Sequence, residues 1–336
     1  MDVVKKIAEA VLYEGYVLWP YRKSAMKNQQ RWTFGGVYPR AYSEARGEDD
    51  PWLMQTQCLV SGDGESKIEV RVRFLHVTER KVGRKVGETL EYVDQLRLGE
   101  DVYLPWDEAT EREIAVGRFI LSDLVEKPRR AGIDIPRGSR EEVLTSPTDE
   151  NTGVLVRSWR ALGGTVEVEA EALREGIYMV TVRITNTTPW EGEDRESTLR
   201  QTFVSTHTVL EVEGGDFVSM TDPPEELQLL VDVCENLKTW PVLVGEEGDR
   251  SMLLSSPIIL YDYPRIAPES PGDMFDGGEI DQLLILNILT LTDEEKAEMR
   301  ASDPRAREIL ERCESLSQEE LMNLHGAIRE FRVLRD

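Results

Sequence analysis

Apolar and polar residues alternate along much of the chain, which predicts strands with one buried and one solvated face. In residues 67–74 every even position is apolar and every odd position is charged. This pattern predicts a strand over 67–77, and the apolar run 52–60 before it predicts another. The polar residues 61–66 between them predict a hairpin. Shorter strands are predicted at 101–104 and 113–121.

The alternation returns beyond residue 150. We expect a three-stranded meander with turns at Gly163-Gly164 and 174–176, then a pair of strands joined at Gly214-Gly215. Strands spaced in this way predict an antiparallel sandwich or barrel. The strands predicted in this part are 153–162, 165–173, 178–185, 199–213, 216–220, 239–244 and 252–260, with a short helix from Pro223-Pro224 to about residue 235.

Both ends of the chain change to a helical period. Residues 2–13 have apolar side chains at helical spacing, and a buried apolar helix is predicted from Ile280 onward. Thr292-Asp-Glu-Glu and Ser317-Gln-Glu-Glu have the pattern of capping boxes. A further helix is predicted after Asp303-Pro304, with proline at the first helical position. We expect four helices to close the β-rich body.

These elements predict an α+β fold that is rich in β structure, with an antiparallel sandwich or barrel-like body and a helical C-terminal segment. The polar, proline-punctuated stretch after residue 126 suggests a connection between two β units. The predicted division is an N-terminal β unit at 1–126, a connection at 127–150, a second antiparallel unit at 151–270 and a helical segment at 271–336.

Charge restricts the classes of partner. The chain has 64 acidic and 40 basic residues among 336, a net charge of −24. Such a chain repels phosphate backbones and anionic lipids, so we expect neither nucleic acid nor membrane insertion. The first 18 residues do not fit a signal peptide, and we expect a cytoplasmic protein. The sequon at Asn186 is therefore expected to carry no glycan.

Motifs that would name a reaction are absent from the sequence. It contains no GxSxG, P-loop, GxGxxG or HExxH pattern. The three cysteines lie far apart, and the three histidines show no ligand spacing. The acidic group Asp273, Asp276, Glu279 and Asp281 fits a hard-cation site or, alternatively, the carboxylates that a helix N-terminus attracts. We predict no catalytic residue, no metal and no cofactor.

Two segments have an unusual composition. Residues 19–32 combine four basic residues with three aromatic ones, and residues 261–292 combine prolines and carboxylates with an apolar run. The two segments could neutralise each other within the fold, or they could hold a partner through charge and aromatic faces. A second basic cluster, Lys127, Arg129, Arg130, Arg137 and Arg140, is interpreted as a solvated linker, with a binding loop as the alternative.

Four blocks of sequence, at 10–32, 105–113, 262–281 and 289–310, resemble an uncharacterised family of proteins encoded beside uptake-type [NiFe] hydrogenase genes in soil actinobacteria and related phyla. The resemblance spans nearly the whole chain. It implies a role in assembling, maturing or working with a [NiFe] hydrogenase, and it assigns no functional residue.

We therefore predict a non-enzymatic accessory protein that binds a hydrogenase subunit or a maturation factor. Two alternatives stay open. One is a carboxylate-dependent enzyme, with Glu269 or Asp273 acting as acid or base near Arg265, and the other is a structural subunit of a larger complex. The sequence does not predict an oligomeric state. The predicted binding residues are Tyr21, Arg22, Lys27, Asn28, Arg265, Glu269, Asp273 and Asp276.

Overall fold

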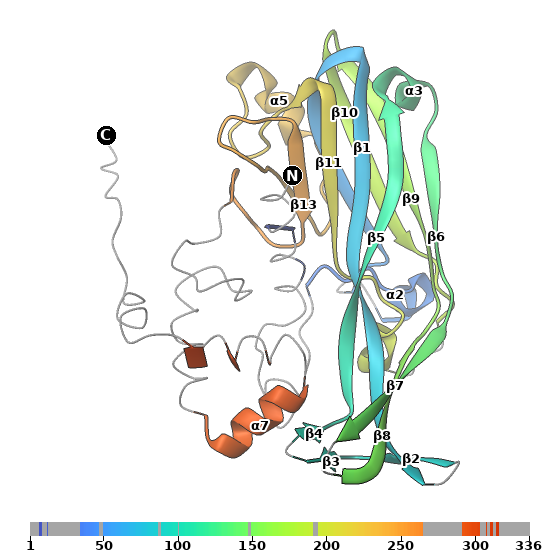
Figure 1. The fold of residues 1–336 in the computed structure, drawn as a ribbon. Coiled ribbons are helices and arrows are strands. Elements are labelled where there is room, and N and C mark those ends of the chain that lie inside the picture. The colour runs from blue at the N-terminus through green and yellow to red at the C-terminus, as the bar shows by residue number, and fades with distance from the viewer. Residues whose placement is uncertain are drawn as a thin grey trace.

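A computed structural model gives the fold of the chain (Figure 1). It describes residues 7, 8, 12, 34–46, 50–86, 89–99, 101–146, 149–190, 194–264, 291–302, 307, 310, 311, 314 and 315. The elements of these residues are, in chain order, α2 Arg40–Arg46, β1 Leu53–Val86, β2 Thr89–Val93, β3 Leu96–Leu98, β4 Asp101–Tyr103, β5 Trp106–Ile120, α3 Leu121–Glu126, β6 Arg129–Ile135, β7 Gly138–Ser146, β8 Asp149–Trp159, β9 Leu162–Arg174, β10 Ile177–Asn186, α4 Arg195–Leu199, β11 Val204–Phe217, the 3₁₀-helix η2 Glu225–Leu227, α5 Gln228–Asp232, β12 Trp240–Leu243, β13 Met252–Ser256 and α7 Asp293–Ser302.

The body of the molecule is an antiparallel sandwich, so the predicted β-rich α+β class is confirmed (Figure 1). One layer contains β6, β9, β10 and the first part of β1. The other contains the second part of β1 with β5, β11, β13 and β12. Strand β1 therefore belongs to both layers, and it joins them into one 11-stranded sheet.

β1 and β11 turn the corner between the layers together. Gly62 pairs with Gly215, and the next pair is Lys67 with Glu213. Gly214 has a φ of +79°, a conformation that glycine adopts without steric cost. The predicted hairpin at 61–66 is therefore wrong in its pairing, because residues 53–61 pair with β10 and residues 67–80 pair with β5.

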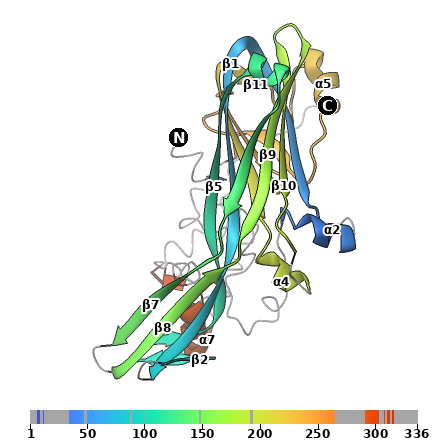
Figure 2. The same ribbon diagram turned by 90° about the vertical axis from the view of Figure 1, so that its right-hand side faces the viewer.

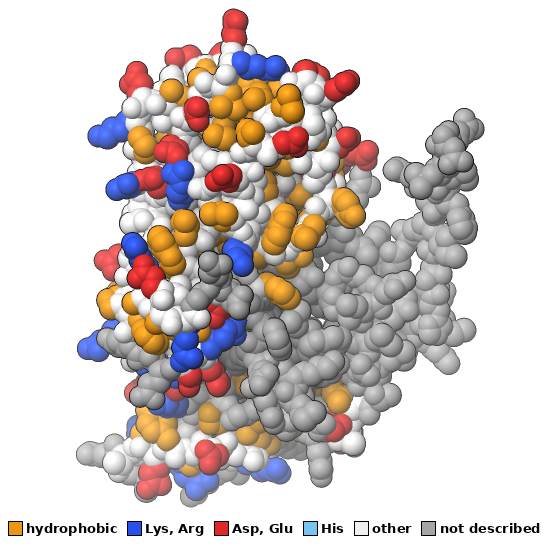
Figure 3. Space-filling view, turned by 180° about the vertical axis from the view of Figure 1, so that it is seen from behind, with side chains coloured by type: hydrophobic (Ala, Val, Ile, Leu, Met, Phe, Trp, Pro, Cys, Tyr) orange, Lys and Arg blue, Asp and Glu red, His pale blue; other side chains and the backbone are white. Residues whose placement is uncertain are grey.

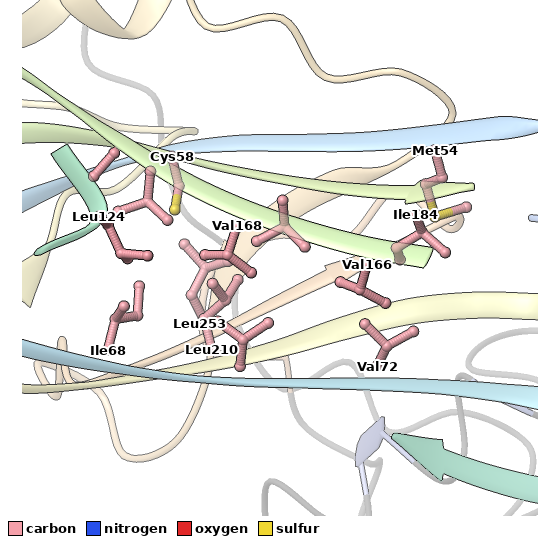
Figure 4. Packing of buried hydrophobic residues seen from close by; sticks show 14 of the residues in the cluster. Met54, Cys58, Ile68, Val72, Leu124, Val166, Val168, Ile184, Leu210 and Leu253 are labelled. Carbon is pink, nitrogen blue, oxygen red and sulfur yellow. The ribbon is translucent and has the colours of Figure 1, made fainter. Parts of the chain in front are cut away.

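The core fills the space between the two layers (Figure 4). Met54 and Cys58 point inward from the first part of β1, and Ile68 and Val72 point toward them from the second part. At one end of this core the rings of Phe74 and Phe203 lie 4.7 Å apart. The charged residues of the alternating pattern lie on the opposite face of the strand, where Arg71 donates to Glu211 across strands at 3.2 Å and Arg73 is buried.

An arm extends from the sandwich, built from long strands that continue out of it (Figures 1 and 2). β6 and β7 run down one side of a hairpin, and β8 and β9 return along the other. In the arm, β8 also pairs with the end of β1. The arm has its own apolar cluster, formed by Val82, Leu96, Leu98, Leu144 and Leu155.

The segment 127–150, expected to be a connection, thus contains β6, β7 and the start of β8. Its strands belong to the same sheet as strands from residues 1–126 and 151–270. The division of the chain into an N-terminal β unit, a second antiparallel unit and a helical segment stays a prediction.

The predicted meander is wrong in one place. β9 and β10 form the expected hairpin. β8 pairs with β7 instead of β9, and it precedes β9 on the same side of the long hairpin. Gly163 and Gly164 lie within β9 rather than in a turn. A Cβ on Gly164 would lie 2.5 Å from the Thr185 carbonyl oxygen and 2.7 Å from the Phe203 ring, so close packing explains this glycine.

The helical ends agree with the sequence wherever they are described. Ile7 and Ala8 are helical and pack on Val209, Val242 and Leu254. Helix α7 begins with the predicted capping box: the Thr292 hydroxyl accepts from the Glu295 N–H at 3.3 Å, and Glu295 accepts from the Thr292 N–H at 2.9 Å. The short helix after Pro224 is present as η2 and α5. The helix predicted from Ile280 and the second capping box, at Ser317, lie outside the described residues.

Candidate functional site

The eight predicted binding residues lie outside the described part of the chain. Tyr21, Arg22, Lys27 and Asn28 precede residue 34, while Arg265, Glu269, Asp273 and Asp276 follow residue 264. Glu279 and Asp281 of the acidic group also lie outside it. Their role in binding stays a prediction.

The structure does show how the acidic segment starts. The Asp262 carboxylate accepts hydrogen bonds from the Ser219 hydroxyl at 2.5 Å, the Thr221 hydroxyl at 2.9 Å and the Leu243 N–H at 2.8 Å. The Tyr261 side chain beside it is 87% exposed. Asp262 therefore ties the start of this segment to β12 and to the chain after β11.

An aromatic and charged cluster lies close after the other predicted segment, and the sequence did not reveal it. Arg195 of α4 donates to Asp50 at 3.1 Å and to the Tyr38 hydroxyl at 2.6 Å. The Tyr42 hydroxyl also donates to Asp50, at 3.0 Å, and the Tyr42 ring meets Trp190 edge-on. Burial and the hydrogen bond to Asp50 raise the pKa of Tyr42. These contacts join two separate stretches of chain, residues 38–50 and 190–195, so we assign the cluster a structural role.

The two described histidines are buried on opposite faces of the sheet. His207 pairs with Arg73 on one face, whereas His76 shares the other face with Phe74. Burial and then the Arg73 charge lower the pKa of His207 to about 3, and burial and Arg112 lower that of His76 to about 4. Both imidazoles are therefore neutral at pH 7. They cannot share a metal ion, and His325 lies outside the described residues.

The two described thiols lie in surroundings that disfavour the thiolate. Cys58 is completely buried in the core, and burial raises its pKa. Burial also raises the pKa of Cys234 to about 11. The thiolate is the nucleophilic form, so neither side chain has the character of a catalytic cysteine. Cys313 lies outside the described residues.

A buried polar region, which we call the neck, separates the sandwich core from the arm. It comprises residues 76–80 of β1, residues 106–112 of β5, of which 106–110 pair with them, and residues 157–159 of β8. His76, Thr78 and Arg80 are almost fully buried on the face that carries Phe74 above and Val82 below. Polar side chains thus interrupt an otherwise apolar interior.

Glu108 is the centre of the neck. Its carboxylate accepts from Arg80 Nη1 at 2.8 Å and from Arg157 Nε at 2.6 Å. Arg80 also donates to the Leu104 carbonyl oxygen, and Arg157 donates to Glu142. Burial alone would lower the pKa of Arg157, but the two carboxylates raise it. These charges compensate one another, so removing a single partner would leave an uncompensated charge in a poorly solvated place.

The basic cluster at 127–140 belongs to strands and their edges, not to a linker. Arg130 pairs with Glu167 of β9, and Arg129 lies 3.5 Å from Asp123 of α3. Lys127, Arg137 and Arg140 are exposed or half-buried. Carboxylates of the same fold therefore balance the charges of Arg129 and Arg130.

Helix α5 shows apolar side chains to solvent. Its buried Val231 packs with Leu227 of η2 against Leu59 and Ile177. Leu229 and Val233, one turn apart, are 78% and 62% exposed. We call Leu229, Val233, Leu237 and Trp240 the α5 surface. In Figure 3, orange side chains gather near the upper end of the molecule, with both acidic and basic side chains beside them.

The comparisons with known proteins do not assign the chain to a family. No protein-family model matches the chain, and a search of curated proteins finds no relative. Among the described residues, no group of three or more His, Cys, Asp or Glu side chains is arranged to hold a metal ion. No described helix is long and apolar enough to cross a membrane. The candidate site among the described residues is the α5 surface, whose apolar side chains are exposed.

Proposed function

We propose that this protein is a non-enzymatic accessory factor that works by binding another protein. Its partner is a [NiFe] hydrogenase subunit or a maturation factor, as the family resemblance implies, and it acts in the cytoplasm. The segments 20–32 and 262–281 contact this partner through Tyr21, Arg22, Lys27, Asn28, Arg265, Glu269, Asp273 and Asp276.

The observation that best supports this proposal is the continuity of the long strands. β1 and the hairpin of β6–β9 run from the sandwich into the arm, and each part has its own apolar cluster (Figures 1 and 2). The result is an elongated body that places distant surfaces at fixed positions. Preorganised surfaces lose little entropy on binding, which suits a protein whose product is an assembly.

The described ionisable groups support the same proposal. The thiols and imidazoles are held neutral by burial. The neck carboxylate Glu108 forms ion pairs with two arginines. In the described part of the chain, these groups favour a structural role over a catalytic one.

The proposal is tested by gentle affinity purification of the tagged protein from its native host, followed by mass spectrometry. We expect hydrogenase subunits or their maturation factors to co-purify. Recovery of the protein alone, at several salt concentrations, would refute the proposed partnership.

A double variant tests the predicted contact segment. Arg265→Ala with Asp273→Ala should weaken recovery of the partner and leave the urea midpoint unchanged. Arg129→Ala with Asp123→Ala is a matched control, because it removes one arginine and one aspartate from the described surface. Equal recovery with both variants would remove the 262–281 segment from the proposal.

A further inference from the structure

The apolar side chains of the α5 surface are exposed to solvent instead of being packed in a core. Helix α5 already covers Leu59 and Val218 with its buried side, so Leu229 and Val233 contribute nothing to that contact. Leu237 and Trp240, in the chain that leads to β12, are a further 44% and 42% exposed. The four exposed apolar side chains thus come from one short stretch of chain, and an exposed apolar patch on a folded protein is typical of a protein contact.

The stretch of chain that carries these apolar side chains is acidic, and Arg174 of β9 donates to its Glu226 carbonyl oxygen at 3.5 Å. Residues 222–240 include five carboxylates, all exposed, and a single lysine, Lys238. The carboxylates are Asp222, Glu225, Glu226, Asp232 and Glu235. An apolar patch with a negative rim attracts a positively charged partner and repels a negative one.

We propose that the α5 surface binds a basic amphipathic segment of a partner protein. The apolar side of that segment covers Leu229 and Val233, and its lysines or arginines meet the carboxylates around them. This inference rests on the proposed function, because it describes the chemistry of a second contact with the partner.

Charge argues against other occupants. A second copy of this chain would bring its own acidic rim to the same place, and each copy has a net charge of −24. Anionic lipid and nucleic acid are repelled for the same reason. A basic segment gains from both the apolar and the charged parts of the surface.

The test uses a fluorescent synthetic peptide that forms an amphipathic helix, with leucines along one side and arginines along the other. Anisotropy titration with the full chain should show binding that weakens as sodium chloride is raised, because salt screens the exposed carboxylates. A control peptide with glutamates in place of the arginines should not bind.

Two matched variants locate the contact. Leu229→Ser with Val233→Ser should weaken peptide binding by about tenfold or more, since both removed side chains lie at the centre of the proposed contact. Val125→Ser with Val143→Ser removes two other exposed valines, 42% and 58% exposed, and should bind like the wild type. Both variants change exposed residues, and unchanged urea midpoints will show that each one folds.

A third variant tests the rim. Glu225→Gln, Glu226→Gln and Asp232→Asn together should weaken binding at low salt and reduce its dependence on salt. Absence of peptide binding, or equal binding by the two serine variants, would overturn the inference. A dimer in sedimentation velocity that Leu229→Ser with Val233→Ser dissociates would also overturn it, because the occupant would then be a second copy.

Purification from the native host separates this inference from the proposed function. If hydrogenase proteins co-purify equally with the wild type and the Leu229→Ser, Val233→Ser variant, the proposed function holds and this surface is not the contact. If none co-purifies with the wild type, the proposed function fails, whatever the peptide shows.

Discussion

Replacing Glu108 by glutamine should destabilise the protein strongly, because this carboxylate balances two arginines in the neck. The side chains of Glu108 and Arg80 are only 12% and 6% exposed. The substitution keeps the volume and one acceptor but removes the negative charge. Removing one partner of a buried ion pair typically costs about 3 kcal/mol or more, since the remaining charge stays in a poorly solvated place.

An exposed ion pair provides the matched comparison. Arg130 pairs with Glu167, but the Arg130 side chain is 75% exposed. Exposed pairs contribute less than about 1 kcal/mol, so Arg130→Ala should change stability little. Urea unfolding of both variants, followed by circular dichroism with the slopes compared, gives the two free-energy changes.

A double variant keeps the reasoning testable if Glu108→Gln does not fold. Arg80→Met with Glu108→Leu removes the most deeply buried pair and leaves Arg157 paired with Glu142, so it should fold and lose less stability than Glu108→Gln. If Glu108→Gln costs no more than Arg130→Ala, the neck charges are better solvated than their burial indicates and the argument is wrong.

Three further predictions concern buried groups. The pKa of His207, lowered to about 3 from 6.5, means that the unfolded state takes up its proton first. Neutral His207 contributes its full stability above pH 6.5, and this contribution falls by about 3 kcal/mol as the pH is lowered to about 4. The variant His207→Gln should therefore flatten the acid side of a profile of urea midpoint against pH between pH 4 and 7. Cys58 should resist a thiol reagent in the native state and react in urea, as peptide mapping would show; rapid native labelling would contradict its burial. Gly164→Ala should lower the melting temperature, whereas Gly163→Ala, whose Cβ would meet only the Thr187 hydroxyl at 3.8 Å, should change it far less.

The sequence predicts the faces of strands better than their partners. The alternation in residues 67–74 places Ile68 and Val72 in the core and Arg71 outside, as the structure shows. It carries no information about which strand lies alongside, since pairing is set by distant residues. The polar stretch 61–66 suits a hairpin turn and equally a corner between layers, and the structure uses it as a corner.

The 127–150 stretch shows how polarity conceals a strand. In β6 only Ile133 is fully buried, and in β7 only Leu144, among the side chains that are described. Strands with little buried area have no clear apolar alternation, so arginines and glycines dominate their pattern. The prolines that suggested a linker include Pro136, which lies between β6 and β7.

The α5 surface was hidden in the sequence for the opposite reason. Leu229, Leu230 and Val231 form one apolar run, and only the structure shows that Leu229 points to solvent while Val231 is buried. A helix of five residues is too short for its period to assign a face. The predicted binding residues were singled out by composition instead, and they stay predictions.

The neck connects this fold to its proposed function. The apolar pattern of β5 and β1 resists a slip by one residue, which would turn every side chain to the other face, but a slip by two residues keeps each side chain on its face. Any slip here separates the Thr78 and Thr110 hydroxyls, which lie 3.1 Å apart, and also separates Arg80 from Glu108. The polar contacts therefore fix the register in which the long strands leave the sandwich, and with it the position of the arm.

It follows that the Arg80→Met, Glu108→Leu variant could fold and still bind a partner less well, if that partner contacts both the arm and the sandwich. A partner that contacts the sandwich alone would bind this variant like the wild type, so one pull-down with this variant shows whether the arm takes part in binding.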